Sequence, residues 1–225
     1  MDKVEIHDIS QSYAQFDVFG PETESLLDKT GVFTGIEWTQ NPQRLSLSDD
    51  EDTRFLLLPP QGVFGLGCRF IVPTDRSAVL ESRLISSGMV RVEPNVYELL
   101  RIEAGLPGEE TELTEDYTPL EAQLGSLVSD TKGCYTGQEI IARQITYDKV
   151  TRKMTGLKLN KEASPGSAVF VEGKNIGRIT SSAISPSHGP IGLAILKRPF
   201  FEPGIQISIH SEGQTTTGVT TSLPF

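Results

Sequence analysis

The first half of the chain mixes two spacings of apolar residues, one typical of strands and one typical of helices. Apolar and polar residues alternate over 4–9 and 15–19, which predicts two half-buried strands. Compact apolar runs over 54–58 and 68–72, joined by a segment rich in proline and glycine, predict a hairpin.

Three further segments carry helix signals. A helix is predicted to start at Gly20-Pro21, a second to cover about 75–87, and a third to begin at Pro94 and end at Gly105. Because strands and helices are interspersed without strict βαβ repeats, this part of the chain is expected to have an α+β fold.

The pattern changes after about residue 155, where short apolar runs are separated by clusters of turn residues. The runs lie at 156–159, 168–171, 176–181, 191–196 and 205–209. Short strands at this spacing predict a small antiparallel barrel or sandwich. The sequence therefore predicts an α+β portion over 1–155 and a β-barrel over 156–225.

The composition of the chain argues against a membrane protein, a secreted protein and a nucleic-acid-binding protein. The 225 residues are 37% hydrophobic and 22% charged, which is ordinary for a soluble globular chain, and no apolar run approaches a membrane span. The first residues lack the basic and apolar regions of a secretion signal. A net charge of −10 argues against direct binding to nucleic acid. We expect no membrane and no nucleic-acid partner.

Cysteine and histidine usage adds two expectations. Cys68 and Cys134 are too few for a disulfide scaffold, so we expect a reducing compartment, and the apolar run around Cys68 predicts a buried thiol. His7, His188 and His210 are scattered without the spacing of metal ligands, so no structural metal is predicted.

Basic residues are concentrated between positions 132 and 158, where only Glu139 and Asp148 oppose them. The basic residues are Lys132, Arg143, Lys149, Arg152, Lys153 and Lys158. Such a cluster is either a solvated face or a place where a small anionic ligand binds.

The octapeptide 132–139, Lys-Gly-Cys-Tyr-Thr-Gly-Gln-Glu, carries the clearest candidate chemistry. Thr136 and Glu139 match a capping box, which predicts that a helix starts at Thr136. Cys134 would then face the positive end of that helix with Lys132 nearby, surroundings that favour a thiolate. The alternative is a small buried cysteine in the turn before a helix.

A carboxylate stands out on the third predicted helix. Val96, Leu99, Leu100 and Glu103 follow helical spacing, so Glu103 falls on the apolar face. A buried carboxylate needs compensation. An ion pair with Lys132 or an arginine would provide it, a boundary position would reach solvent, and a bound ligand is the third alternative.

The octapeptide resembles the signature of the YgfZ branch of the glycine-cleavage T-protein (aminomethyltransferase) superfamily. Further segments resemble that family in the expected order, at 4–10, 18–21, 101–106, 118–122, 177–182 and 191–194. The resemblance implies a T-protein-like fold, with a ferredoxin-like α+β portion that is incomplete because the chain is shortened at its N-terminus, followed by the barrel.

The same resemblance implies tetrahydrofolate as cofactor. Glu103 stands where the family's Arg-x-Glu-Ala-Gly motif has a folate-binding glutamate, and its two oxygens match the adjacent amino and ring N–H groups of a pterin. Lys132 stands where the family has an arginine. Arg101, Tyr135 and Gln138, in the same two motifs, complete the predicted folate contacts.

Three functions remain open from the sequence. The first is a tetrahydrofolate-binding accessory protein for assembly or repair of iron–sulfur enzymes, with Cys134 as the catalytic residue and iron–sulfur proteins or their assembly machinery as partners. The second is an aminomethyltransferase or other folate-dependent one-carbon transferase, although the family's catalytic carboxylate is expected in the missing segment. The third is a scaffold without folate binding. Cytoplasm, mitochondrial matrix and plastid stroma would each suit reduced thiols.

Overall fold

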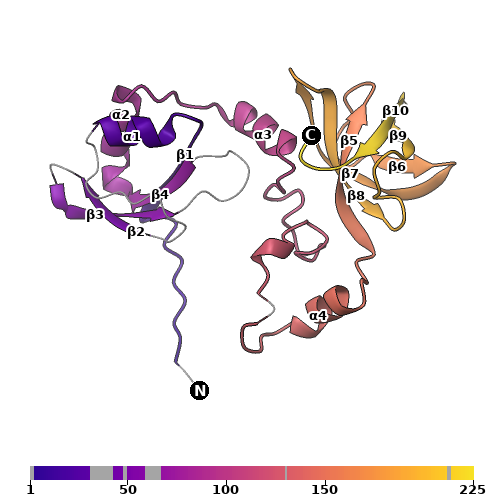
Figure 1. The fold of residues 1–225 in the computed structure, drawn as a ribbon, viewed down its shortest axis with the longest axis horizontal. Coiled ribbons are helices and arrows are strands. Elements are labelled where there is room, and N and C mark those ends of the chain that lie inside the picture. Colours follow the sequence, from indigo (N-terminus) through magenta and orange to yellow (C-terminus); the bar gives the residue numbers. More distant parts are fainter. Residues whose placement is uncertain (1–2, 31–42, 48–49, 59–66, 130, 212–213) are drawn as a thin grey trace. The chain divides into compact units, whose positions relative to one another are not determined.

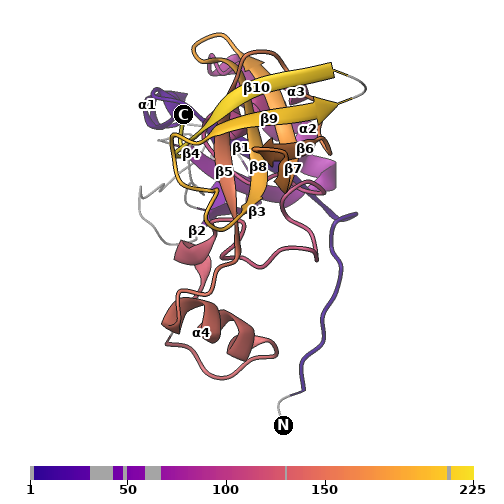
Figure 2. The ribbon, with the colours of Figure 1, turned by 90° about the vertical axis from the view of Figure 1, so that its right-hand side faces the viewer.

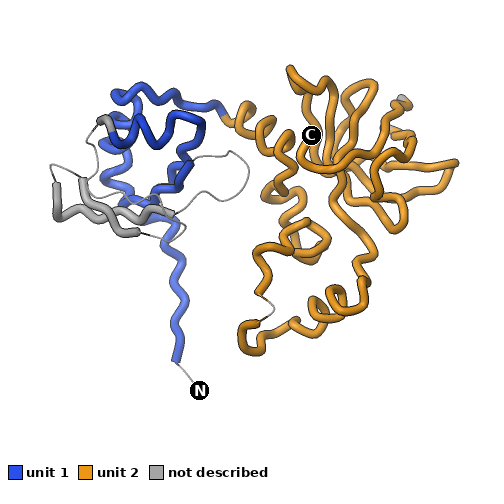
Figure 3. The backbone as a smooth tube through the Cα atoms, in the orientation of Figure 1, with its two compact units in different colours: residues 1–93 blue, residues 94–225 orange. Residues whose placement is uncertain are grey.

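The computed structural model describes residues 3–30, 43–47, 50–58, 67–129, 131–211 and 214–225. The chain forms two compact units, Met1–Glu93 and Pro94–Phe225, coloured blue and orange in Figure 3. Helices and strands occur in both units, so the predicted α+β class is confirmed.

The first unit is built on an antiparallel sheet with strand order β1-β4-β3-β2 (Figure 1). The strands are β1 (Tyr13–Phe19), β2 (Gln43–Leu47), β3 (Asp50–Leu58) and β4 (Gly67–Pro73). The helices are α1 (Thr23–Thr30) and α2 (Ser77–Ser86), the latter preceded by a 3-10 turn at Thr74–Arg76. Phe70 and Val72 of β4 pack with Leu27 of α1 and Leu80 of α2, which joins the helices to the sheet in one core.

Two of the strand predictions for this unit have opposite outcomes. The hairpin is confirmed, because β3 pairs antiparallel with β4 and Leu57 lies opposite Phe70; its connection, 59–66, lies outside the described residues. The strand predicted over 4–9 is wrong. Val4 and Ile6 are exposed there, because alternation alone supplies neither a partner strand nor a layer to cover the apolar face.

The second unit begins with α3 (Pro94–Glu103), continues through an irregular segment with a 3-10 turn at Gly125–Leu127, and reaches α4 (Gln138–Thr146). A closed antiparallel barrel follows, with strand order β10-β5-β8-β7-β6-β9 (Figure 2). Its strands are β5 (Arg152–Leu159), β6 (Ala168–Val171), β7 (Lys174–Ser185), β8 (Gly189–Lys197), β9 (Gln206–Ser211) and β10 (Gln214–Thr221).

Strand β8 is buried on both faces, which explains its continuous apolar run. Ala194 and Leu196 belong to the main barrel core, whereas Leu193 and Ile195 pack with Ile102 of α3. Successive side chains of a strand point to opposite faces, so α3 covers the outer face of the barrel. Figure 1 shows α3 lying against the strands at this edge.

The small antiparallel barrel is confirmed, and it contains one strand that the sequence did not predict. That strand is β10, whose threonines give no apolar run. The barrel starts at Arg152, but the compact unit that contains it starts at Pro94, because α3 packs on the barrel. The domain division at residue 155 stays a prediction. Every helix of the described chain falls short, in length or apolar character, of what a bilayer crossing needs.

Candidate functional site

Glu103 is the last residue of α3 and is half-buried against the barrel. Its Oε1 accepts a 2.5 Å hydrogen bond from Oγ of Ser185, the final residue of β7. Ser185 is buried, and its Oγ in turn accepts hydrogen bonds from the backbone N–H groups of Ser187 (3.1 Å) and His188 (2.9 Å). The turn after β7 therefore fixes the Glu103 carboxylate.

The ion pair that was one of three alternatives for Glu103 is absent from the described part of the chain. Neither Lys132 nor an arginine pairs with this carboxylate there, and a neutral hydroxyl takes that place. A neutral donor leaves the negative charge of Glu103 uncompensated, so the carboxylate retains capacity for further hydrogen-bond donors.

The end of α3 is held by residues close to the end of the chain. Gly105 ends the helix with a φ of +69°, and a Cβ added there would lie only 2.7 Å from Cβ of Leu223. The backbone N–H of Phe225 donates a 3.0 Å hydrogen bond to the carbonyl oxygen of Glu103. Glycine is needed at position 105 both for the left-handed backbone and for this close approach.

Arg101 lies on the same helix but is committed to a buried network. All five of its N–H donors are used, on both oxygens of Glu98, on the carbonyl of Leu106, on Glu112 at 3.1 Å and on Ser181 at 2.6 Å. The side chains of Arg101 and Glu112 are only 4% and 0% exposed. This arrangement favours a structural role over the predicted folate contact of Arg101.

The cysteine motif forms a loop that leads into α4. Cys134 is exposed, so the alternative of a buried cysteine is wrong. The predicted capping box is also wrong. The helix starts at Gln138 after Gly137, whose φ of +88° is left-handed, and no side chain caps it. Lys132 and Tyr135 contact each other, with the Lys132 Nζ 4.5 Å from the centre of the ring, and Gln138 is half-buried.

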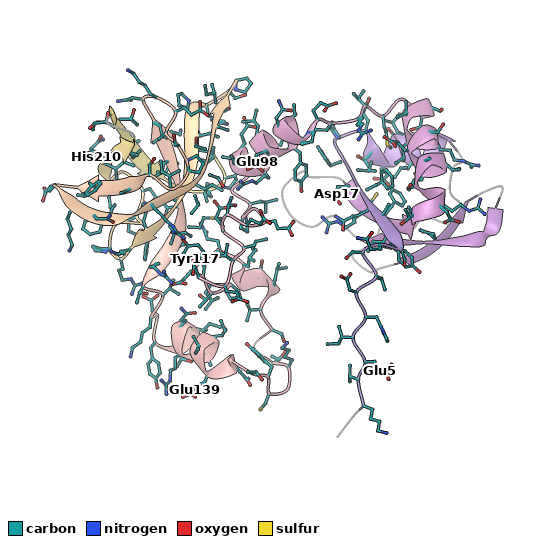
Figure 4. The ribbon with its side chains drawn as sticks, turned by 180° about the vertical axis from the view of Figure 1, so that it is seen from behind. Glu5, Asp17, Glu98, Tyr117, Glu139 and His210 are labelled. Carbon is teal, nitrogen blue, oxygen red and sulfur yellow. The ribbon has the colours of Figure 1, made fainter. Side chains whose placement is uncertain are left out.

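The predicted site residues therefore fall into two groups within the second unit. Lys132, Cys134, Tyr135 and Gln138 share one loop and the start of α4, whereas Glu103 and Arg101 share the end of α3. Figures 1 and 2 both show α4 away from α3. Figure 4 shows the same separation through the labelled Glu139 of α4 and Glu98 of α3. The structure does not bring Cys134 and Glu103 into one site.

Ser185 is the residue of this site that the sequence did not reveal. The Ser185-Pro186-Ser187 segment signals only a turn after a strand. Nothing in that pattern identifies a carboxylate on a distant helix as the partner of Ser185.

The other cysteine has different chemistry. Cys68 is buried on β4, as predicted, and burial together with the nearby Asp17 raises the pKa of its thiol from 9.0 to about 12. Cys68 is therefore a neutral packing residue at physiological pH. Among the residues that the structure describes, no group of three or more histidine, cysteine or acidic side chains is arranged to hold a metal ion.

Comparison with known proteins identifies relatives of the whole chain and of its barrel. Residues 152–225 match the family model described as the glycine cleavage T-protein C-terminal barrel domain. The chain is 29% identical over 240 residues to the "Putative transferase At1g60990, chloroplastic" of Arabidopsis thaliana, covering 100% of this chain and 51% of that protein. It is 28% identical over 243 residues to the mitochondrial aminomethyltransferase of Dictyostelium discoideum, covering 97% and 59% respectively.

A solved structure is similar in fold. The aminomethyltransferase T of the glycine cleavage system from Bartonella henselae matches with a TM-score of 0.57 at 15% identity, over 94% of this chain and 83% of that one. The chain spans about half to three fifths of the length of the two curated relatives named above. Residues 152–225 are therefore similar to the C-terminal barrel domain of the glycine cleavage T-protein, and the chain as a whole is similar to part of the length of proteins that include aminomethyltransferases.

Proposed function

We propose that this protein binds tetrahydrofolate and that Glu103 is the carboxylate that holds the pterin. The observation that carries the proposal is the half-buried Glu103 carboxylate, which Ser185 orients and which no cation neutralises among the described residues. A half-buried carboxylate is stabilised by additional donors, and the amino and ring N–H groups of a pterin supply two adjacent ones. Glu103 and its surroundings fit the pterin. Arg101 does not add a contact, because all its N–H donors are used by groups of the protein.

The finer role that we propose is accessory to iron–sulfur enzymes, with Cys134 as the working thiol. The exposed position of Cys134 and the resemblance of residues 132–139 to the YgfZ signature support it. Iron–sulfur clusters bind thiolates, but one cysteine cannot hold a cluster alone. Cys134 would therefore act together with thiols of an iron–sulfur protein or of its assembly machinery.

Aminomethyl transfer, or another one-carbon transfer to tetrahydrofolate, is the second candidate. It is favoured by relatives that are named aminomethyltransferases, such as the one from Dictyostelium discoideum. This candidate uses the same Glu103 anchor and gives Cys134 no part in the chemistry.

The folate proposal is tested by calorimetric titration of the full chain with tetrahydrofolate under anaerobic conditions. We expect the wild type to bind, and Glu103→Gln to weaken binding by about tenfold or more, because one charge-assisted hydrogen bond contributes about 1.5–3 kcal/mol. Glu162→Gln, an exposed glutamate in the loop after β5, is the matched control. A wild type that does not bind would indicate a scaffold without folate.

The two finer roles are separated by Cys134→Ala. In cells that lack their own copy of the gene, the wild type should restore iron–sulfur enzyme activity and the variant should not, while its circular dichroism spectrum is unchanged. Full rescue by the variant would contradict the accessory role. Formation of methylene-tetrahydrofolate from a lipoyl-bound aminomethyl donor, retained in the variant, would support the transferase.

A further inference from the structure

A cavity of about 520 Å³ is present on the barrel, and neither Glu103 nor any residue of the cysteine motif lines it. It is bordered by Asp116 and Tyr117 of the irregular segment and by residues of strands β5 to β8. Figure 4 labels Tyr117 at the edge of the barrel strands. The volume lies within the range of small-molecule sites.

Three cations from three adjacent strands line this cavity. Arg152 of β5 lies directly opposite Lys197 of β8, and Arg178 of β7 lies opposite Ile195, two residues before Lys197. Residues two apart in a strand share a face, so all three cationic side chains project from one face of the sheet. Like charges directly opposite each other destabilise a sheet, which makes an anion favourable at this point.

The protein's own anions balance this cluster only in part. Arg152 donates to both oxygens of the buried Glu121, at 3.0 and 3.1 Å, and is well paired. Arg178 meets Asp116 at 3.4 Å, and these side chains are 52% and 70% exposed, so their pairing is weak. Lys197 is exposed and forms no ion pair with any described residue.

Neutral donors complete the lining. The Oδ1 of Asn175 accepts a 3.1 Å hydrogen bond from the backbone N–H of Gly177, which leaves the amide NH₂ of Asn175 able to donate. The hydroxyl of Tyr117 accepts from Nε of Arg178 at 2.9 Å and keeps its own proton for a ligand. The Tyr117 ring also contacts both guanidinium groups, 5.2 Å from Arg152 and 5.7 Å from Arg178 at its centre, which fixes the cluster.

We propose that this cavity binds a small, multiply charged anion through Lys197, Arg178 and Asn175. The ligand belongs to the phosphate or polycarboxylate class, since both present several acceptor oxygens that match cations and N–H donors. The net charge of −10 opposes the binding of an extended polyanion such as a nucleic-acid backbone. The local cluster of cations therefore selects a compact anionic ligand.

The test is calorimetric titration of the full chain at low ionic strength with pyrophosphate in one arm and citrate in the other. We expect saturable binding in at least one arm, and the stronger arm identifies the class. Lys197→Gln should weaken that binding about tenfold or more. The control is Lys158→Gln, an exposed lysine on β5 that does not line the cavity, and it should leave the affinity within about twofold.

Three outcomes would overturn the proposal. They are no binding of either anion, equal losses in Lys197→Gln and Lys158→Gln, and an unchanged affinity in Lys197→Gln. Nuclear magnetic resonance provides two checks. The amide signals of 175–178 should shift when the wild type is titrated with the anion, and the spectrum of Lys197→Gln should keep the chemical-shift dispersion of a folded protein. Neither readout uses folate, so failure here is separate from failure of the Glu103 proposal.

Discussion

The Oγ of Ser185 donates a 2.5 Å hydrogen bond to Oε1 of Glu103, across 82 positions of sequence. Two backbone N–H groups donate to the same Oγ, so the hydroxyl proton is directed toward the carboxylate. The barrel thereby sets the orientation of the proposed pterin anchor.

Ser185→Ala should weaken tetrahydrofolate binding by about two- to tenfold, because a neutral hydrogen bond contributes about 0.5–1.5 kcal/mol. The cause would be a carboxylate that loses its preferred orientation while its charge remains. Calorimetric titration measures the change, and Ser187→Ala is the control, since only the backbone of Ser187 takes part. Equal affinities for wild type and Ser185→Ala, alongside a loss in Glu103→Gln, would show that Ser185 does not position the anchor.

Arg101→Met should lower the stability of the second unit by about 3–5 kcal/mol, because it leaves the fully buried Glu112 without its cation. Amide hydrogen exchange of β7 reports on this unit directly. Replacing Arg101 and Glu112 together by apolar residues should cost less than the sum of the single changes.

Arg143→Met is the matched control for that experiment, because the pair of Arg143 with Glu139 on α4 is largely exposed. We expect a change within about 0.5 kcal/mol. A similar small effect in Arg101→Met would refute the assignment of a structural role to the buried network.

The two cysteines should react differently with iodoacetamide. At pH 8 the native protein should be alkylated at the exposed Cys134 and protected at Cys68, which burial keeps as a thiol. Peptide mass spectrometry locates the label, and urea-unfolded protein, in which both cysteines react, is the control. Rapid native labelling of Cys68 would contradict its burial.

The raised pKa of Cys68 also predicts how stability depends on pH. The folded thiol keeps its proton up to about pH 12, while the unfolded thiol loses it near the ordinary value of 9.0. Above pH 9 the folded state therefore binds more protons than the unfolded state. The contribution of Cys68 to the free energy of unfolding falls as the pH rises from about 9 toward 12. The free energy of unfolding, measured by denaturation at several pH values, should fall less steeply with pH in Cys68→Ala than in the wild type over this window.

Gly177→Ala should destabilise the barrel by about 1–3 kcal/mol or more, because the added Cβ would collide with the backbone carbonyl of Ile195 on the paired strand β8. Thermal denaturation followed by circular dichroism measures the loss. Gly133→Ala is the control, since a Cβ at position 133 meets only open space. Equal melting temperatures for the two variants would mean that the strands can separate at little cost.

The barrel was largely predictable because its core strands are marked by apolar runs between turns of proline and glycine. Strand β10 was not, because its pairing with β5 and β9, and not its composition, places Thr220 in the interior. The error at 4–9 is the reverse case, in which a suitable alternation lacks a partner. Pairing is a property of the whole fold, and local pattern reports it only indirectly.

The candidate site likewise has features that the sequence predicted and features that it did not. The helical spacing of α3 predicted Glu103 on an apolar face, and Glu103 is half-buried although Val96 of the same stripe is exposed. The motif located Cys134 correctly before a helix. The partner of Glu103 could not be foreseen, because Ser185 meets it only through the packing of α3 on β7. The capping box failed because the helix starts one residue later than the motif predicts, so that Gly137, with its left-handed backbone, and not Thr136 occupies the N-cap position.

The hold of Leu223 and Phe225 on the end of α3 has a consequence for biosynthesis. Helix α3 leaves the ribosome long before these two residues are translated, and domains begin to fold while synthesis continues. The contacts that Leu223 and Phe225 make with Gly105 and with the carbonyl oxygen of Glu103 can therefore form only after these residues have emerged. A nascent chain stalled inside the barrel would carry α3 without the contacts that hold the C-terminal end of this helix.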